Sequence, residues 1–163
     1  MAKDKWEEYG LTATATWIPA TEYDGERPLV QAYGVCLAGG VACVLRSPQT
    51  GHTMMPGGTV EQGEDIVETL HREVAEEADL TVDEPELLGV QRIEYSDVHP
   101  DYETETVYQA RLVAHVERAG FITEDPSEGF KFERCFVPVS ELNEALDWGA
   151  IGDELVRLAK QRV

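Results

Sequence analysis

Hydrophobic and polar residues alternate in several stretches of the chain, and such alternation is typical of β-strands with one buried face. The pattern predicts strands at residues 11–18, 29–37, 41–45, 87–95, 107–116 and 135–139. The pair Gly39-Gly40 predicts a tight turn between the second and third of these. In the strand at 107–116, the apolar residues share one face, and Gln109, Arg111 and His115 lie on the other.

Other stretches repeat apolar residues at helical spacing. The clearest covers about residues 65–78, where Asp65 and Glu68 form a plausible capping box at its start. Ser140 predicts the N-cap of a short helix through residue 146, and a final helix follows from about residue 151. Helices interspersed among strands indicate an α/β or α+β class with a mixed sheet.

The length of 163 residues suits one compact domain. Residues 1–28 are mixed and turn-rich, so we expect an N-terminal extension with one strand, followed by a domain over residues 29–163. Residues 28–45 carry no charge, which a hydropathy window could take for a membrane helix. Gln31 and the glycine pair favour two buried strands there instead.

Charge narrows the possible partners. The chain has 13 Lys and Arg against 32 Asp and Glu, a net charge of −19. Such a surface disfavours nucleic acid polymers and anionic membranes as partners, because both bind through clustered basic residues. A small polyanionic substrate would need a cation to accompany it.

Cysteine usage points to a reducing compartment. Cys36, Cys43 and Cys135 are odd in number, lie among apolar residues and have neither disulfide nor zinc-site spacing. We expect all three to be reduced core residues. The first residues lack the apolar stretch of a secretory signal, so the expected location is the cytoplasm.

The helix at 65–78 carries three glutamates on one side, Glu73, Glu76 and Glu77. Glu77 falls inside the apolar arc of the helix, where a charge is costly unless it is compensated. A divalent cation such as magnesium or manganese would compensate it, since both prefer oxygen ligands. The alternative is that these glutamates only form a solvated charged face.

The spacing around these glutamates is specific. Gly58 is followed, at intervals of five, seven, one and one residues, by Glu64, Arg72-Glu73-Val74, Glu76-Glu77 and Asp79-Leu80. This spacing closely resembles the signature of the Nudix hydrolases, in which glycine, glutamate, arginine-glutamate-apolar, glutamate-glutamate and glycine-apolar occur at those intervals. Asp79 replaces the last glycine, where a left-handed residue is expected, at a cost of about 1 kcal/mol.

The resemblance implies an α/β/α sandwich with a mixed β-sheet that binds magnesium, with manganese as a substitute, and hydrolyses a diphosphate linked to another group. Carried over by position, Glu73 and Glu77 are the principal metal ligands. Glu76 is a further ligand or the general base, and the Gly57 carbonyl is a backbone ligand.

Supporting roles fall on other residues of the motif and of later loops. Arg72 and Glu64 would hold the loop against the helix, and Gly58 would let the backbone pass close to the phosphates. Glu128 is the alternative general base, although a solvated surface role is the plainer interpretation of that loop acid. Tyr95 lies where some dinucleoside-polyphosphate-cleaving members carry a tyrosine, which makes it a candidate for substrate binding.

Together these features favour magnesium-dependent hydrolysis of a small nucleotide substrate, a nucleoside triphosphate or an ADP-sugar. Three alternatives remain open: a nucleotide-sensing Nudix module that does not cleave, a dinucleoside polyphosphate hydrolase, and an acidic interaction protein. Because the family often forms homodimers, a homodimer is a further expectation.

Overall fold

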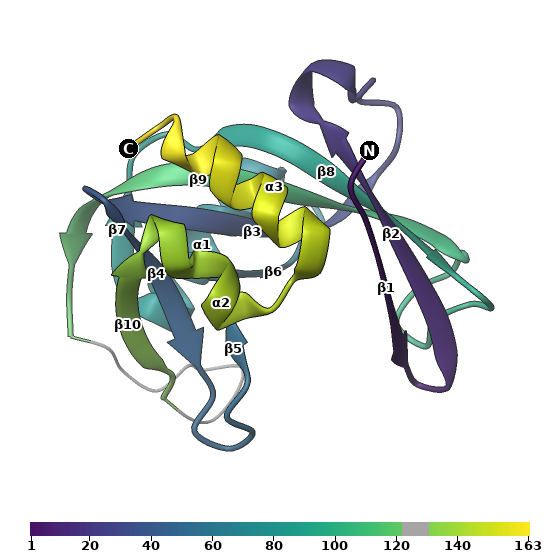
Figure 1. Cartoon of the computed structure of the whole chain (residues 1–163), viewed down its shortest axis with the longest axis horizontal. Coiled ribbons are helices and arrows are strands. Elements are labelled where there is room, and N and C mark those ends of the chain that lie inside the picture. The colour runs from purple at the N-terminus through teal and green to yellow at the C-terminus, as the bar shows by residue number, and fades with distance from the viewer. Residues whose placement is uncertain (122–130) are drawn as a thin grey trace.

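The strands form one mixed sheet in the computed structural model, which describes residues 1–121 and 131–163 (Figure 1). Along the sheet the order is β1-β2-β8-β9-β3-β4-β10, and every neighbouring pair is antiparallel except β3 with β9. The bounds of these strands are β1 (Lys3–Glu8), β2 (Leu11–Pro19), β8 (Glu86–Tyr95), β9 (Thr106–Ala119), β3 (Leu29–Ala38), β4 (Val41–Arg46) and β10 (Glu133–Pro138).

Strand β3 changes its antiparallel partner along its length. Residues 31–33 pair with β6 (Gly57–Thr59), whereas residues 37–38 pair with β4. Two further short strands attach to the sheet, β5 (Thr53–Met54) on β4 and β7 (Leu80–Val82) on β9. The divergence of β4 and β6 places the glycine pair of β6 beside the helix that follows it.

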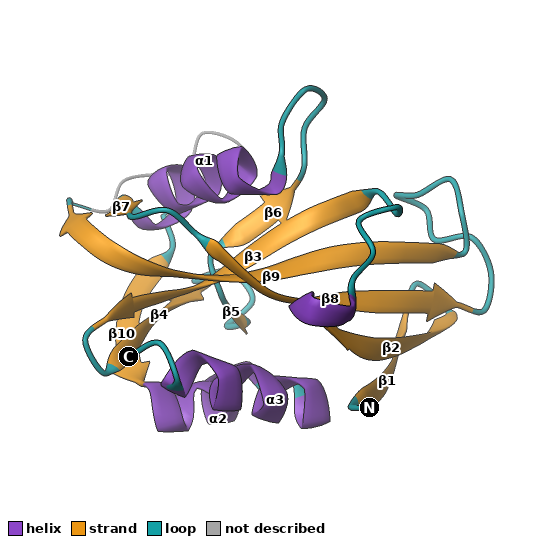
Figure 2. Ribbon diagram, turned by 90° about the horizontal axis from the view of Figure 1, so that it is seen from above, coloured by secondary structure: helices purple, strands orange, loops and turns teal. Residues whose placement is uncertain are grey.

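Helices cover both faces of the sheet, as Figure 2 shows. Helix α1 (Ile66–Ala78) lies on one face, and α2 (Leu142–Leu146) and α3 (Gly149–Lys160) lie on the other. Leu70 of α1 packs into one buried cluster, and Leu155 of α3 packs into a second. Burial of these apolar surfaces is the main stabilising contribution to the fold. The predicted α/β class and the three-layer arrangement are confirmed.

Both ends of α1 follow from the local sequence. The Asp65 side chain accepts from the backbone N–H of Glu68, and the Glu68 side chain accepts from Asp65, so the predicted capping box is present. Asp79 adopts the expected left-handed conformation, with φ 51° and ψ 49°. Arg134 of β10 donates to the carbonyl oxygen of Ala78 at 2.6 Å, which satisfies one of the last acceptors of the helix. This contact was not predicted.

The N-terminal segment contributes more to the sheet than one strand. The predicted strand is β2, which pairs with β8 and buries Ala13, Ala15 and Trp17. Strand β1, which the alternation pattern did not reveal, pairs with β2 along the edge of the sheet. The charged residues of β1 are typical of an edge strand. Because almost every position is charged, the strand shows no alternation of hydrophobic and polar residues.

Two local predictions are wrong. Ser140 does not cap α2; a 3-10 turn at Val139–Glu141 comes first, and Glu141 is the N-cap without a side-chain cap bond. Cys135 is not a core residue, because it lies exposed on β10. Cys36 and Cys43 are buried as expected, and burial raises the pKa of the Cys43 thiol to about 12.

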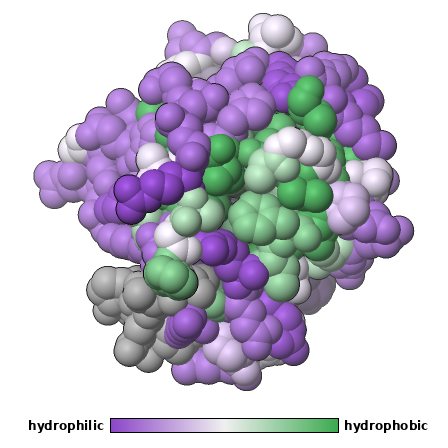
Figure 3. All heavy atoms as spheres, turned by 90° about the vertical axis from the view of Figure 1, so that its left-hand side faces the viewer, coloured by the Kyte–Doolittle hydropathy of each residue, from purple (hydrophilic) through white to green (hydrophobic). Residues whose placement is uncertain are grey.

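Residues 28–45, whose hydropathy resembles that of a membrane helix, form β3 and β4 instead. No helix in the described parts of the chain is long and apolar enough to cross a bilayer. The face at the left of Figure 1, where β10 lies, carries a hydrophobic area among hydrophilic residues (Figure 3).

Candidate functional site

Glu77 is the buried carboxylate that the helical pattern placed in the apolar arc of α1. The residue is 5% exposed, and its Oε1 accepts a hydrogen bond of 2.9 Å from the backbone N–H of Gly57. A buried carboxylate needs such donors because it has lost its water. This hydrogen bond connects β6, which belongs to the sheet, to the last turn of α1.

The glycine pair of β6 is required by close packing. Gly57 has φ 154°, and a Cβ on it would lie 2.3 Å from the carbonyl oxygen of Ala32 and 2.5 Å from the ring of Tyr33. A Cβ on Gly58 would lie 2.4 Å from Oε1 of Glu73. Real Cβ atoms do not make such contacts, so only glycine allows the helix carboxylate to lie against this backbone.

Arg72 holds the acidic groups around it together. Its Nε and Nη2 donate to the two carboxylate oxygens of Glu64 at 2.7 and 3.1 Å, a bidentate pair. Its Nη1 lies 3.0 Å from Glu73 and 3.4 Å from Glu76, and Nη2 also donates to the Thr59 carbonyl. The hydrogen bonds from Arg72 lower the pKa of Glu64 to about 2.

The structure therefore contains the predicted contact between the loop and the helix, which Glu64 and Arg72 make. Arg72 pairs with Glu64 and with Glu76, whereas Glu68, one turn earlier on α1, takes part in the helix cap. Thr69 adds a hydroxyl that donates to Glu64 at 2.9 Å, a contact that helical spacing alone did not suggest.

The chemistry of this donor set suits a divalent cation. Carboxylate oxygens of Glu73, Glu76 and Glu77 come from one side of α1, next to a backbone that only glycine can form. Among the described residues, no three acidic, imidazole or thiol groups converge into a ready-made metal cage. The reason is that Glu73 and Glu76 accept hydrogen bonds from Arg72, whereas Glu77 accepts one from the backbone N–H of Gly57.

A sequence profile of the NUDIX domain matches residues 26–158, most of the chain. The chain belongs to the NUDIX family. The carboxylates, the arginine and the glycine pair described above lie within the matched residues, and α1 and β6 place them together. Nudix hydrolases generally use divalent metal cations. No curated protein matches the chain.

Solved structures show the same fold. A Bacillus subtilis pyrophosphohydrolase, BsRppH, has a TM-score of 0.68 and 16% identity, covering 99% of this chain and 98% of its own. An Ap4A hydrolase from C. elegans has a TM-score of 0.51 and 19% identity, covering 83% and 98%. An ADP-ribose pyrophosphatase from Streptococcus suis has a TM-score of 0.55 and 14% identity, covering 83% and 93%. Identities this low relate this Nudix chain to them by fold.

Tyr95 does not join this group of contacts. The Tyr95 hydroxyl donates to Glu8 of β1 at 2.9 Å, and its ring lies beside those of His99 and Tyr102. Burial and the bond to Glu8 raise the pKa of Tyr95. Glu128 lies outside the described residues, so its role as a base stays a prediction.

Tyr33 is a neighbour of the Nudix motif that sequence reasoning missed. It pairs with Gly57 across β3 and β6, and its ring would meet any side chain at that glycine. The spacing of residues along the chain could not predict this contact, because Tyr33 and Gly57 lie 24 positions apart in the sequence. Tyr33 therefore forms a wall next to the site.

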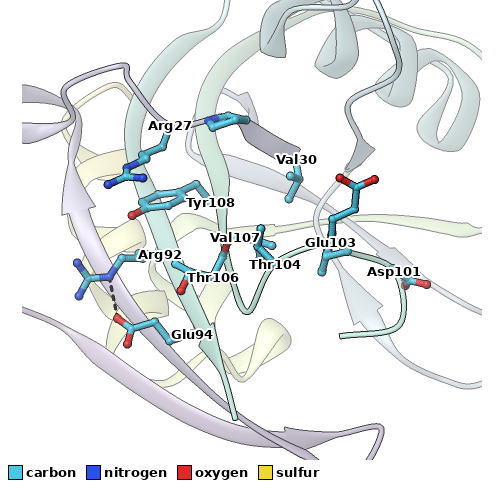
Figure 4. Close-up of a pocket in the computed structure, with 12 residues that line it drawn as sticks. Arg27, Val30, Arg92, Glu94, Asp101, Glu103, Thr104, Thr106, Val107 and Tyr108 are labelled. Carbon is cyan, nitrogen blue, oxygen red and sulfur yellow. Dashed lines mark hydrogen bonds and ion pairs between the residues drawn. The ribbon is translucent and has the colours of Figure 1, made fainter. Parts of the chain in front are cut away.

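A cavity of ≈ 880 Å³ lies elsewhere on the domain, lined by β8, β9 and the loop that joins them (Figure 4). Arg27 and Tyr108 line it, and Arg92 pairs with Glu94 at 2.9 Å. None of the motif carboxylates borders this cavity. It is accordingly separate from the Nudix site.

Proposed function

We propose that this Nudix protein is a metal-dependent pyrophosphohydrolase that cleaves a nucleoside diphosphate linked to another moiety, in the nucleoside triphosphate or ADP-sugar class. Family membership and the pyrophosphohydrolase neighbours support an enzyme of this reaction type. Magnesium is the proposed cofactor, with manganese as a substitute, because the side-chain donors are carboxylate oxygens.

One observation carries the proposal. Glu77 is buried as an acceptor from the glycine backbone, while Glu73 and Glu76 beside it are held by one arginine. A solvated charged face, as in an acidic interaction protein, would need neither the burial nor the glycine pair. The arrangement fits a site that brings several negative groups together for a cation.

Each residue then has a role that its contacts support. Glu73 and Glu77 would be the principal ligands, with the Gly57 carbonyl as a backbone ligand. Arg72 and Glu64 keep the loop against α1, so that the carboxylates stay aligned. The bound cation would neutralise the diphosphate oxygens and acidify the attacking water.

Glu76 is the proposed general base. Its side chain is 33% exposed, against 14% for Glu73, so it is better placed to accept a proton from water. Glu128 remains the alternative base. Exchanging each glutamate for glutamine separates the two, because removal of the base changes the pH dependence of kcat.

The test is phosphate release from nucleoside triphosphates, ADP-sugars and dinucleoside polyphosphates, with magnesium, with manganese and with a chelator. Metal-dependent cleavage of triphosphates or ADP-sugars supports the proposal. Preferred cleavage of dinucleoside polyphosphates would favour that alternative, in which Tyr95 contacts the substrate. Nucleotide binding without cleavage would favour a sensing module, and absence of both metal and nucleotide binding would favour an acidic interaction protein.

Two further expectations accompany this function. A homodimer would appear as twice the chain mass in light scattering, and a single mass would refute it. Cytoplasmic location would appear in cell fractionation with a cytoplasmic marker. The partner proposed is a small nucleotide, with no nucleic acid polymer and no membrane, as the net charge of −19 favours.

A further inference from the structure

Among the described strands, β10 forms one of the two edges of the sheet, and it lies at the left of Figure 1. The other edge is β1, in which every residue except Trp6 is charged. Such charges are a common protection against pairing with another chain. In β10 the run from Cys135 to Pro138 carries no charge, and Cys135, Phe136 and Pro138 are exposed. The β10 edge therefore lacks the protection that β1 has.

A second exposed aromatic residue lies close to this strand. Arg134 of β10 donates to the carbonyl oxygen of Gly120 at 3.0 Å, and Phe121, the next residue of the chain, is 93% exposed. Phe136 lies two positions after Arg134, on the same face of the strand, and is 36% exposed. Figure 3 shows a hydrophobic area on this side of the molecule. Apolar side chains gathered beside an open strand edge indicate a protein contact.

The main-chain hydrogen bonds show which groups of β10 point away from the sheet. The N–H of Val139 donates to the carbonyl oxygen of Gly40, which precedes β4. These groups alternate from one side of a strand to the other, so the odd-numbered residues of β10 bond toward β4. The N–H and C=O groups of Arg134 and Phe136 therefore point outward. No backbone group in the described part of the chain pairs with them.

A second copy of the same strand would satisfy these outward groups. In an antiparallel pairing centred on Cys135, Arg134 of each copy faces Phe136 of the other copy. Each facing pair then exchanges both N–H···O=C bonds, and the two-fold symmetry repeats the exchange in the other pair. Pro138 has no N–H, so the ladder ends there.

The charged side chain of the strand is also compatible with this pairing. Glu133 faces Val137 of the other copy rather than a like charge. Its carboxylate is already paired with Arg46 of β4 at 2.8 Å. At the centre, the two Cys135 side chains face each other and are small enough to fit near the axis. The pairing therefore opposes no like charges.

Neighbouring registers are less favourable. A centre at Arg134 would place two arginines opposite each other. A centre at Phe136 would face Arg134 with Pro138, which has no N–H to donate. A centre between two residues would turn the apolar side chains of one copy to the wrong face of the sheet. The self-complementary register is accordingly the one centred on Cys135.

We propose that the β10 edge is the interface of a homodimer, in which the β10 strands of two copies pair antiparallel about a two-fold axis at Cys135. The inference rests on the homodimer expected with the proposed function and adds the surface that forms it. The contact is short, so the dimer is weak and concentration-dependent. Each copy has a net charge of −19, so the two copies repel and salt should strengthen the contact.

The first test is the mass in solution, measured by sedimentation over a series of protein concentrations. We expect the mass to rise toward twice the chain mass. The dissociation constant should be at least about threefold lower in 1 M salt than in 0.1 M, because the Debye length falls from about 10 Å to about 3 Å. A single-chain mass at every concentration, or a dimer that salt weakens, would overturn the inference.

Two variants at one exposed position test the register. Phe136→Lys places a positive charge opposite Arg134 of the second copy, whereas Phe136→Glu places a negative charge there. Because the axis repeats this contact, the dissociation constant should be at least about tenfold higher for the lysine variant than for the glutamate variant. General repulsion between two acidic chains gives the reverse order, since the lysine makes each copy less negative. Equal affinities or the reverse order would overturn the proposed register.

The matched control for these variants is Val98→Lys. Val98 is an exposed apolar residue of the loop between β8 and β9, and it is 44% exposed. This control makes the same change of charge far from β10 along the sheet. It should dimerise within about threefold of the unmodified protein, since one charge at a distance is screened. A loss of dimer equal to that of Phe136→Lys would refute β10 as the interface.

A cross-link measures the geometry directly. In the proposed register the two Cys135 residues form a non-hydrogen-bonded pair with Cα atoms about 4.5 Å apart, within the range of a disulfide. Diamide accepts two hydrogens as the two Cys135 thiols become one disulfide, while Cys36 and Cys43 are buried. We expect a linked dimer on a non-reducing gel, and none for Cys135→Ser. A solution dimer that diamide does not link would overturn the register.

The inference fails separately from the proposals on which it rests. A dimer that Phe136→Lys leaves intact would keep the homodimer and refute β10 as its surface. Phosphate release by a protein that stays a single chain would keep the hydrolase and refute the dimer. Dimerisation as described, without cleavage of any substrate, would support the interface and refute the hydrolase.

Discussion

The replacement Glu77→Gln tests whether the buried carboxylate exists to hold a cation. The change keeps the shape of the side chain and an oxygen that can accept from the N–H of Gly57, but it removes the charge. The bond becomes neutral, which costs roughly 1 kcal/mol. Loss of repulsion with Glu73, one helical turn away, returns about 0.2–0.5 kcal/mol. In chelator, the variant should therefore unfold within roughly 2–4 °C of the unmodified protein.

Magnesium should separate the two proteins. At a concentration 100 times Kd, a ligand that binds only the folded state stabilises it by about 2.7 kcal/mol, which is roughly 5–10 °C for a chain of this length. The variant should show little of this gain, and its kcat should fall at least about 100-fold, since the ligand contributes several kcal/mol to the transition state.

Thermal unfolding with magnesium and with chelator, followed by phosphate release, measures both effects. Glu144→Gln, an exposed glutamate of α2, makes the same charge change and should gain stability from magnesium as the unmodified protein does. If Glu77→Gln gains as much from magnesium as this control does, or hydrolyses substrate at the unmodified rate, the assignment of Glu77 as a ligand is refuted.

Three further changes test the surroundings of the site and the fold. Gly58→Ala should lower kcat at least about tenfold with little loss of helix content by circular dichroism, because its Cβ would displace Glu73; undiminished activity would contradict this. Asp79→Gly should raise stability by about 0.5–1 kcal/mol in urea unfolding, since it removes a left-handed aspartate; a loss of stability would be the opposite result. The bond of His115 to the Arg162 carbonyl raises the pKa of the imidazole, so its stabilising contribution should be full below pH 6.5 and decline as the pH rises past the raised value. His115→Gln should remove that part of the pH dependence of Tm, and an unchanged profile would refute it.

Local sequence determined the elements that carry the motif. Apolar spacing, with Asp65 as N-cap and Asp79 as the left-handed end, was enough to place α1 almost to the residue. The same spacing put Glu73, Glu76 and Glu77 on one side and Glu77 in the buried arc, because both features depend only on the period of the helix. Alternation likewise located β2, β3, β4, β8, β9 and β10.

The tertiary structure decided what surrounds that motif. Tyr33 lies against Gly57, Arg134 reaches the end of α1, and Arg111 is buried, only because strands distant in the sequence pair in one register. On sequence alone, Arg111 was simply a polar residue on one face of a strand, since alternation does not say whether a second layer covers that face. Here α3 lies on that side of the sheet, so the polar face became the lining of a cavity. The periodicity of hydrophobic residues is a local property of the chain, whereas strand register and the packing of layers depend on the whole fold. Register and packing therefore determine which residues surround the site.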